Sequence, residues 1–291
     1  MKKILSYFIV SIFVVASCSK KKEEPKSAEF NQGELVVLAD DSFKSVVEGL
    51  AQAYMINYPS TKVEVKVQKE DLAFMDMLNN HAKMIAISKP LNQEEIQEYE
   101  KATNTKFHQD FFAIDAVLFV VSKNSTRTSL SIEDIKKELL SGEKNLIFDG
   151  NNSSNLNFVA NKIGKKPSEL KYATIVGNDE VVKELDRYPN KIGVISLNTI
   201  SRPYANEATK LREMINVLPI EEKGKVISYE GEGLTKMKYP FVRTIYFLTN
   251  ENGFGIAKGF LRFSCTQLGQ IVVSKEGLQP YFLFNREVQM R

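Results

Sequence analysis

Residues 146 to 159, LIFDGNNSSNLNFV, place short polar side chains between a predicted buried strand and a predicted helix. Ser153, Ser154 and Asn155 carry the hydroxyl and amide donors of this run. The first turn of a helix has backbone N–H groups without partners, and it lies at the positive end of the helix dipole. A junction of this kind can bind a dehydrated oxyanion. The alternative is that these residues are plain N-caps, a common role for Ser and Asn.

Residue types that carry catalysis are scarce in this chain. It has only two histidines, His81 and His108, and two cysteines, Cys18 and Cys265. It has no G-x-S-x-G or H-E-x-x-H motif. These counts argue against a His-dependent triad and against a three-His metal site. We therefore expect a binding protein rather than an enzyme, with no cofactor and no metal.

The N-terminus has the pattern of an export signal. Two lysines precede an apolar stretch, residues 4 to 16, which is too short to span a bilayer and matches a signal-peptide core. The following Val-Ala-Ser-Cys sequence resembles a bacterial lipobox, in which the chain is cut before an acylated cysteine. We predict a signal peptide at residues 1–17, lipid on Cys18 and a polar tether at 18–30. The alternative is an ordinary secretory signal with a chance cysteine.

Charge and cysteine content narrow the possible partners. The chain has 39 basic and 36 acidic residues, a net charge of +3. This balance offers no electrostatic footprint for nucleic acid. Cys265 lies in an apolar pattern and is expected in the core. We expect a protein of the cell envelope, anchored to the membrane by lipid and facing the periplasm or the cell exterior.

Strand and helix patterns alternate along the rest of the chain. Strands are predicted at 34–39, 62–67, 84–87 and 192–197. Helix starts are predicted after the N-cap segment Asp40-Asp41-Ser42, after a capping box at 92–95, and after Ser131 and Asn178. This order predicts an α/β fold with a mainly parallel sheet, whose ligands lie at the carboxyl ends of strands.

Two segments, 111–122 and 239–249, are longer and more apolar than the other predicted strands. Because they are far apart in sequence, both could run between two lobes. We therefore expect one lobe from residues 31–112 and 241–291, and a second lobe from residues 113–240.

Several segments together resemble a known family, and they cover almost everything after the tether. They are ELVVLADDSFKSVV, MIAISKPLNQEE, AIDAVLFVVSKNS, LSIEDIKKELLSGE, GNDEVVKELDRYPNKIGVISL and the stretch from YPFVRTIYFLTNENGFG to GLQP. This series resembles the substrate-binding proteins of phosphate ABC transporters. The resemblance implies a two-lobed periplasmic-binding-protein fold, type II-like, with a hinged central cleft. It also implies a protein that binds phosphate or a similar oxyanion and delivers it to an ABC permease. We expect a monomer, because the two lobes are complete and the tether contributes no core.

The resemblance also assigns ligand-binding residues. Ser153, Ser154 and Asn155 occupy the place of the family's R-x-x-x-S-G-T loop, and Ser42 lies near its first loop. Ser88 matches the serine of its S-D-x-P loop, and Lys89 replaces the aspartate. The sequence departs from the family's R-x-x-x-S-G-T pattern in two further ways: no Arg precedes Ser153, and the loop of Ser153, Ser154 and Asn155 lacks the glycine.

Two accounts of these departures remain open. In one, Lys89 and Lys44 supply the missing positive charge, and an anion site is kept. In the other, acidic residues gather at the cleft and favour a cationic or zwitterionic ligand; these are Asp40, Asp41, Glu70, Asp71 and Asp149. A structural, adhesive or sensory lipoprotein with a different or lost ligand is the rival function.

Overall fold

The computed structural model describes residues 29–284, so Cys18 and the predicted signal peptide lie outside the described residues. Its strands are β1 (Gln32–Ala39), β2 (Ser60–Val67), β3 (Met84–Ile87), β4 (Asp110–Ser122), β5 (Leu130–Ser131), β6 (Leu146–Phe148), β7 (Ala173–Thr174), β8 (Ile192–Ser196), β9 (Ile215–Val217), β10 (Ile220–Glu222), β11 (Lys225–Ile227), β12 (Val242–Thr249) and β13 (Gln279–Pro280).

The α-helices are α2 (Lys44–Asn57), α3 (Glu70–Leu78), α4 (Gln93–Thr103), α5 (Ile132–Leu140), α6 (Ser154–Lys162), α7 (Asn178–Glu184), α8 (Leu197–Ile200), α9 (Asn206–Met214), α10 (Glu232–Thr235), α11 (Ile256–Ser264) and α12 (Gln267–Lys275). Three short 3-10 helices are η1 (Asp41–Phe43), η2 (Pro167–Glu169) and η3 (Leu185–Arg187). Across residues 29–284, every helix is too short or too polar to cross a membrane.

A curled sheet runs through both lobes in the order β2-β1-β3-β12-β4-β8-β6-β7, and β9 and β13 also pair with β4. The outer strands are parallel: β1 pairs with β2 and β3, and β6 pairs with β7 and β8. The central strands β4 and β12 are antiparallel to each other and to their other neighbours. The sheet is therefore mixed, and the prediction of a mainly parallel sheet is wrong at its centre.

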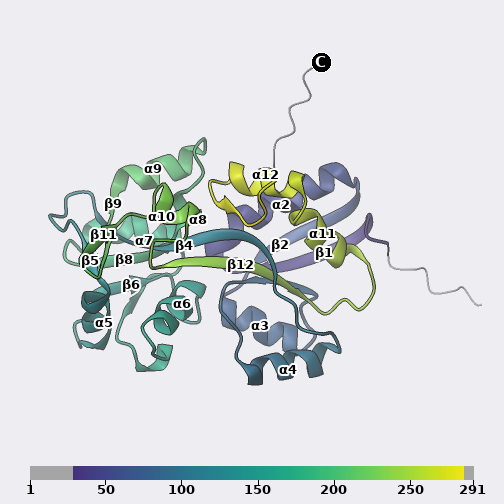
Figure 1. Cartoon of the computed structure of the whole chain (residues 1–291), viewed down its shortest axis with the longest axis horizontal. Coiled ribbons are helices and arrows are strands. Elements are labelled where there is room, and N and C mark those ends of the chain that lie inside the picture. Colours follow the sequence, from purple (N-terminus) through teal and green to yellow (C-terminus); the bar gives the residue numbers. More distant parts are fainter. Residues whose placement is uncertain (1–28, 285–291) are drawn as a thin grey trace, which may run out of the picture.

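The two long strands cross between the lobes, as their length and apolar character predicted (Figure 1). The first half of β4 pairs with β12 as far as Ala116, whereas the second half pairs with β8 and β9 from Val117 onward. The lobe boundaries predicted at 112/113 and 240/241 stay predictions. β12 begins at Val242 rather than at Tyr239, because Pro240 cannot donate to the ladder and the segment before Val242 forms a turn.

Helices cover both faces of the sheet in each lobe. In the first lobe, α2, α11 and α12 lie on one face, and α3 and α4 lie on the other (Figure 1). The predicted apolar face of α2 is fully buried; its residues are Val46, Val47, Leu50 and Tyr54, together with Phe43 at the N-cap position. Phe112 of β4 stacks on Phe247 of β12 with ring centroids 4.1 Å apart. Cys265 is half-buried and packs against this core, as predicted.

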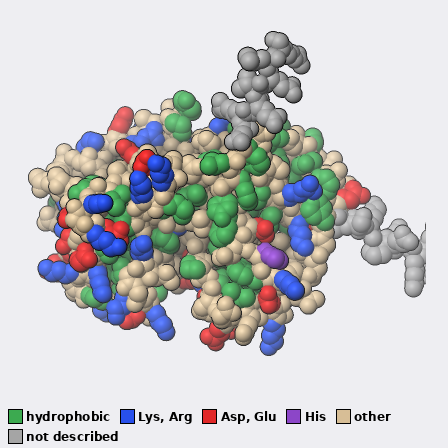
Figure 2. Space-filling view, in the orientation of Figure 1, with side chains coloured by type: hydrophobic (Ala, Val, Ile, Leu, Met, Phe, Trp, Pro, Cys, Tyr) green, Lys and Arg blue, Asp and Glu red, His purple; other side chains and the backbone are tan. Residues whose placement is uncertain are grey.

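The surface mixes charges of both signs. Figure 2 shows basic and acidic side chains interspersed over the second lobe, and an indentation between the lobes at the lower edge. In Figure 1 this edge lies between α6 and α3. The first turns of these two helices are therefore positioned to meet at the region between the lobes.

Candidate ligand-binding site between the lobes

Asp40, directly after β1, lies at the centre of the region between the lobes. Its carboxylate caps η1 by accepting a hydrogen bond from the N–H of Ser42 at 3.0 Å. The same carboxylate accepts the N–H groups of Glu70 and Ser154, each at 3.1 Å. Glu70 and Ser154 are the first residues of α3 and α6. Three junctions, from both lobes, therefore direct backbone donors at one buried carboxylate.

Glu70 provides a second buried carboxylate beside the first. Its Oε1 accepts the N–H of Ser88 at 2.6 Å, the hydroxyl of Ser88 at 3.1 Å and the N–H of Lys89 at 3.2 Å. Its Oε2 accepts the side-chain amide of Asn157 from α6 at 3.1 Å. The N–H and hydroxyl donors that follow β3, on Ser88 and Lys89, therefore also donate to a carboxylate of the chain itself.

Arg243 of β12 is the buried cation of the region. Its Nε and Nη2 donate to Oδ2 of Asp115 at 2.8 and 2.7 Å, and the side chains of both residues are fully buried. Nη2 also lies 2.9 Å from Oδ1 of Asn155, and Nη1 lies 3.4 Å from Oγ of Ser154. The guanidinium packs over the ring of Phe43, 4.8 Å from its centroid. The positive charge at the polar loop therefore comes from a strand distant in sequence.

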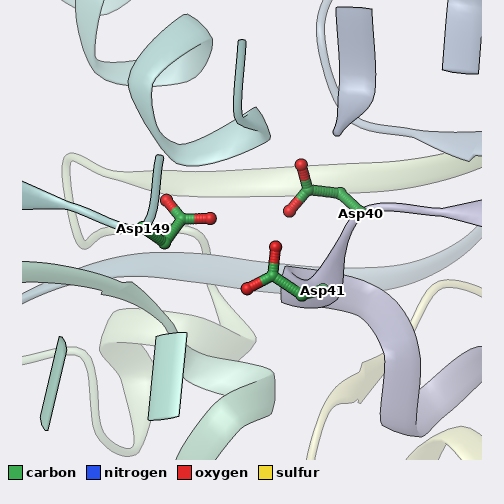
Figure 3. Close-up of side chains that lie close together, drawn as sticks. All are labelled: Asp40, Asp41 and Asp149. Carbon is green, nitrogen blue, oxygen red and sulfur yellow. The ribbon is translucent and has the colours of Figure 1, made fainter. Parts of the chain in front are cut away.

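Three aspartates and one lysine form a second charged group. Asp40, Asp41 and Asp149 point toward one another, and one oxygen of each lies within 4.8 Å of the others (Figure 3). Lys69 donates to Asp41 and, at 2.7 Å, to Oδ2 of Asp149. This ammonium bridges the two lobes, since Lys69 precedes α3 and Asp149 follows β6. The aspartates are thus paired with a cation of the chain.

Burial controls the ionisation of this group. It raises the pKa of Asp40, and the neighbouring charge of Asp41 raises it further. It also raises the pKa of Asp149 to about 7, with Asp40 and Asp41 adding to the effect. Burial opposes the charge on Lys69, but the three carboxylates outweigh it and raise the lysine pKa. Asp40 and Asp149 therefore keep their protons to higher pH than isolated carboxyls. At Asp41 burial is outweighed by the charge of Lys69 and by hydrogen bonds from Lys69 and Asn178, so the pKa of this carboxyl is lowered.

Asn178 joins the same network, although the sequence pattern predicted it as a plain helix cap. The N-cap position of α7 is Gly177, and Asn178 is the first helical residue. Its amide donates to Asp41 at 2.7 Å and to the hydroxyl of Ser42 at 3.2 Å. Its amide oxygen accepts from Asn155 at 2.9 Å. The cap prediction is wrong because these partners lie on the facing loops, not on the helix.

The predicted ligand-binding residues lie as follows. Ser42, Ser153, Ser154 and Asn155 are fully buried, and Ser88 is 6% exposed. The loops that bear them meet through two carboxylates: Asp40 accepts the N–H groups of Ser42 and Ser154, and Glu70 accepts that of Ser88. The hydroxyl of Ser153 accepts the N–H of Leu156 at 3.3 Å, so this residue is also an N-cap. Their roles toward a ligand stay predictions.

The two lysines proposed as counter-charges, Lys89 and Lys44, each lie near carboxylates outside the predicted polar loop. Nζ of Lys89 lies 3.0 Å from Asp71 and 2.9 Å from Glu95. Lys44 is half-exposed, and its Nζ lies 3.9 Å from Glu48 on the same helix. Arg243 is the cation that contacts Ser154 and Asn155. The sequence contained a signal for it, because Asp115 interrupts an apolar strand and a buried carboxylate needs a charged or hydrogen-bonding partner.

A two-lobed α/β fold with converging donors between its lobes defines a class of solute-binding proteins. The profile of the PBP superfamily domain matches residues 24–267, so the chain belongs to the PBP superfamily. It is 23% identical to the "Phosphate-binding protein PstS" of Borreliella burgdorferi over 95% of this chain and 98% of that protein.

Solved structures show the same fold. An ABC-type phosphate transport receptor from Vibrio cholerae superposes with a TM-score of 0.63 at 15% identity, covering 85% of this chain and 100% of that one. A Clostridium perfringens protein solved with bound phosphate gives a TM-score of 0.69 at 18% identity, covering 86% and 100%.

Proposed function

We propose that this chain is the extracytoplasmic substrate-binding lipoprotein of an ABC importer, and that it captures phosphate or a related small oxyanion between its lobes as a monomer. The role is binding rather than catalysis, with a permease as the receiving partner. Family membership and the named functions of the relatives support this proposal.

One observation carries the choice of an oxyanion. The N–H groups of Ser42, Glu70 and Ser154 converge on a single acceptor between the lobes. Backbone donors at helix starts suit a dehydrated anion, because they add no bulk and belong to the positive ends of helix dipoles. The guanidinium of Arg243 supplies charge beside them. We therefore propose that Ser42, Ser88, Lys89, Ser153, Ser154 and Asn155 border the ligand.

Thermal unfolding of the purified full chain tests the binding role. A ligand at 100 times its dissociation constant stabilises the folded state by about 2.7 kcal/mol. We expect phosphate or arsenate to raise the melting temperature in this way, with chloride at equal ionic strength as the control. If no small oxyanion shifts the transition at millimolar concentration, oxyanion capture is not the function.

A second candidate is a structural, adhesive or sensory lipoprotein of the same fold with another ligand or none. The observation that favours it is that the carboxylates of Asp40 and Glu70 take up the converging donors. Under this candidate, oxyanions leave the melting temperature unchanged.

The anchor is tested by Cys18→Ala. Without the thiol no lipid can be attached, so we expect the protein to move from the membrane fraction to the soluble fraction while its melting temperature is unchanged. Cys265→Ala is the matched control, because Cys265 lies within the folded part, and this variant should stay with the membrane. A Cys18→Ala protein that remains membrane-bound contradicts lipid anchoring.

A further inference from the structure

Building on the proposed function, we propose that Asp40 and Glu70 are an internal anion of this chain. Their carboxylates occupy the oxyanion site and determine which external ligand can enter it. Asp40 accepts the N–H groups of two helices in addition to that of its own short helix.

Helix capping alone does not explain the position of Asp40. A capping side chain satisfies the N–H groups of the helix that it precedes. Asp40 caps η1, but it also accepts from Glu70 and Ser154, which are 30 and 114 residues away in the sequence. α6 already has a cap of its own, the side chain of Ser153. Asp40 therefore fills a point where N–H groups of both lobes meet.

The size and charge of this side chain match an oxyanion. A carboxymethyl group is nearly as large as a tetrahedral oxyanion, and it offers the same kind of negative oxygens to N–H donors. Asp40 is fully buried, so no solvent competes for these donors. Its backbone has φ −59 and ψ 147, which any residue adopts, so a smaller side chain fits here without backbone strain.

Glu70 extends the internal anion to the neighbouring loop. It takes the donors of Ser88 and Lys89, and it is also fully buried. The side-chain amide of Asn157, from the other lobe, donates a hydrogen bond to Oε2 of Glu70. An external oxyanion must therefore displace two carboxylates to reach the N–H donors that Asp40 and Glu70 accept.

The surrounding charges make this displacement costly for an anion. The cations of this region are Arg243, which is fully buried and paired with Asp115, and Lys69, which is 17% exposed and paired with Asp41 and Asp149. A dianion placed beside Asp40 would meet like charge at low dielectric, where repulsion is strong, and both cations already have carboxylate partners. Removal of the Asp40 carboxylate would leave three N–H donors free and one negative charge fewer. The site would then accept an oxyanion more readily.

Asp40 also links the lobes directly, because it joins η1 to Ser154 of α6. The hydrogen bonds of Lys69 with Asp149 and of Asn178 with Asp41 also join the two lobes. The internal anion thus holds the two lobes together through hydrogen bonds.

The test is isothermal titration of inorganic phosphate into the full chain and into Asp40→Ala, Asp40→Asn and Glu48→Ala. We expect Asp40→Ala to bind phosphate at least about tenfold tighter than the unaltered protein, because a charged competitor for the donors is lost. Asp40→Asn should bind with intermediate affinity, since it keeps an acceptor but loses the charge. Glu48→Ala removes an exposed carboxylate of α2 and should bind like the unaltered protein.

Each outcome of this titration either supports or overturns the internal anion. Phosphate affinity that is unchanged or weaker in Asp40→Ala and Asp40→Asn overturns the internal anion, as does the absence of binding in all variants. If Asp40→Ala fails to fold, judged by circular dichroism, Asp40→Asn alone decides by the same criterion. The proposed function is judged separately on the unaltered protein: phosphate capture fails if only the variants bind, although the internal anion then stands.

Discussion

Arg243→Ala is expected to lower the free energy of unfolding by about 3 to 5 kcal/mol, one of the two largest effects for a single residue of this site. The change removes the guanidinium but leaves the carboxylate of Asp115 fully buried. Hydrogen bonds from Ser196 Oγ at 2.9 Å and from the N–H of Asn198 at 3.2 Å remain, but neither donor carries charge. Denaturant unfolding followed by circular dichroism measures the loss.

Two further variants separate charge from packing. Arg243→Lys keeps the charge but loses the two bonds that Nε and Nη2 make to Oδ2 of Asp115, so we expect an intermediate loss. Arg187→Ala is the matched control, because this arginine is 73% exposed and its pair with Glu184 is worth little. A loss in Arg243→Ala no larger than that in Arg187→Ala would show that the buried pair does not stabilise the fold.

Lys69→Met is expected to be strongly destabilising above neutral pH, by about 3 to 5 kcal/mol, because Asp40, Asp41 and Asp149 lose their common counter-charge. The side chain of Lys69 is 17% exposed, so solvent screens the interaction little. Lys66→Met on β2 is the control, since Lys66 is 55% exposed and lies 3.7 Å from Glu64. We expect it to change stability by less than about 0.5 kcal/mol.

The effect of Lys69→Met should depend on pH, and its sign follows from Asp149. The pKa of Asp149 is raised from 3.8 to about 7 in the folded protein, so the folded state binds more protons than the unfolded state between these values. Its contribution to stability is present below the lower value and is lost as pH rises through about 7. Without the ammonium of Lys69, which lowers the pKa of Asp149, this loss grows.

Unfolding free energies at about pH 5 and pH 8 test this sign. The deficit of Lys69→Met relative to the unaltered protein should be larger at the higher pH. Asp149→Asn cannot titrate, and it should reduce the pH dependence in the same interval. A deficit that is equal at both values, or larger in acid, would mean that the aspartates are not held by Lys69.

Local patterns in the sequence predicted the elements that carry the site. The strand 84–87, the capping box of Asn92 with Glu95 and the N-cap at Ser131 appear in the structure as predicted. The buried face of α2 also follows its apolar spacing. These features depend on residues a few positions apart, where periodicity and helix-end chemistry act directly. The two crossing strands were predictable because length and apolarity are also local properties.

The tertiary structure decided how the charges are used. Residues 40, 70 and 154 are distant in sequence, yet two of them donate to the carboxylate of the first. No local pattern distinguishes Asp40 as an ordinary cap from Asp40 as the acceptor for three junctions. In the same way, a cluster of acidic residues at the cleft was one of the two accounts that the sequence left open, but nothing in the sequence indicated that Lys69 would pair with Asp41 and Asp149. The strength of a charge depends on its burial and on neighbours brought by the fold, and chain spacing specifies neither.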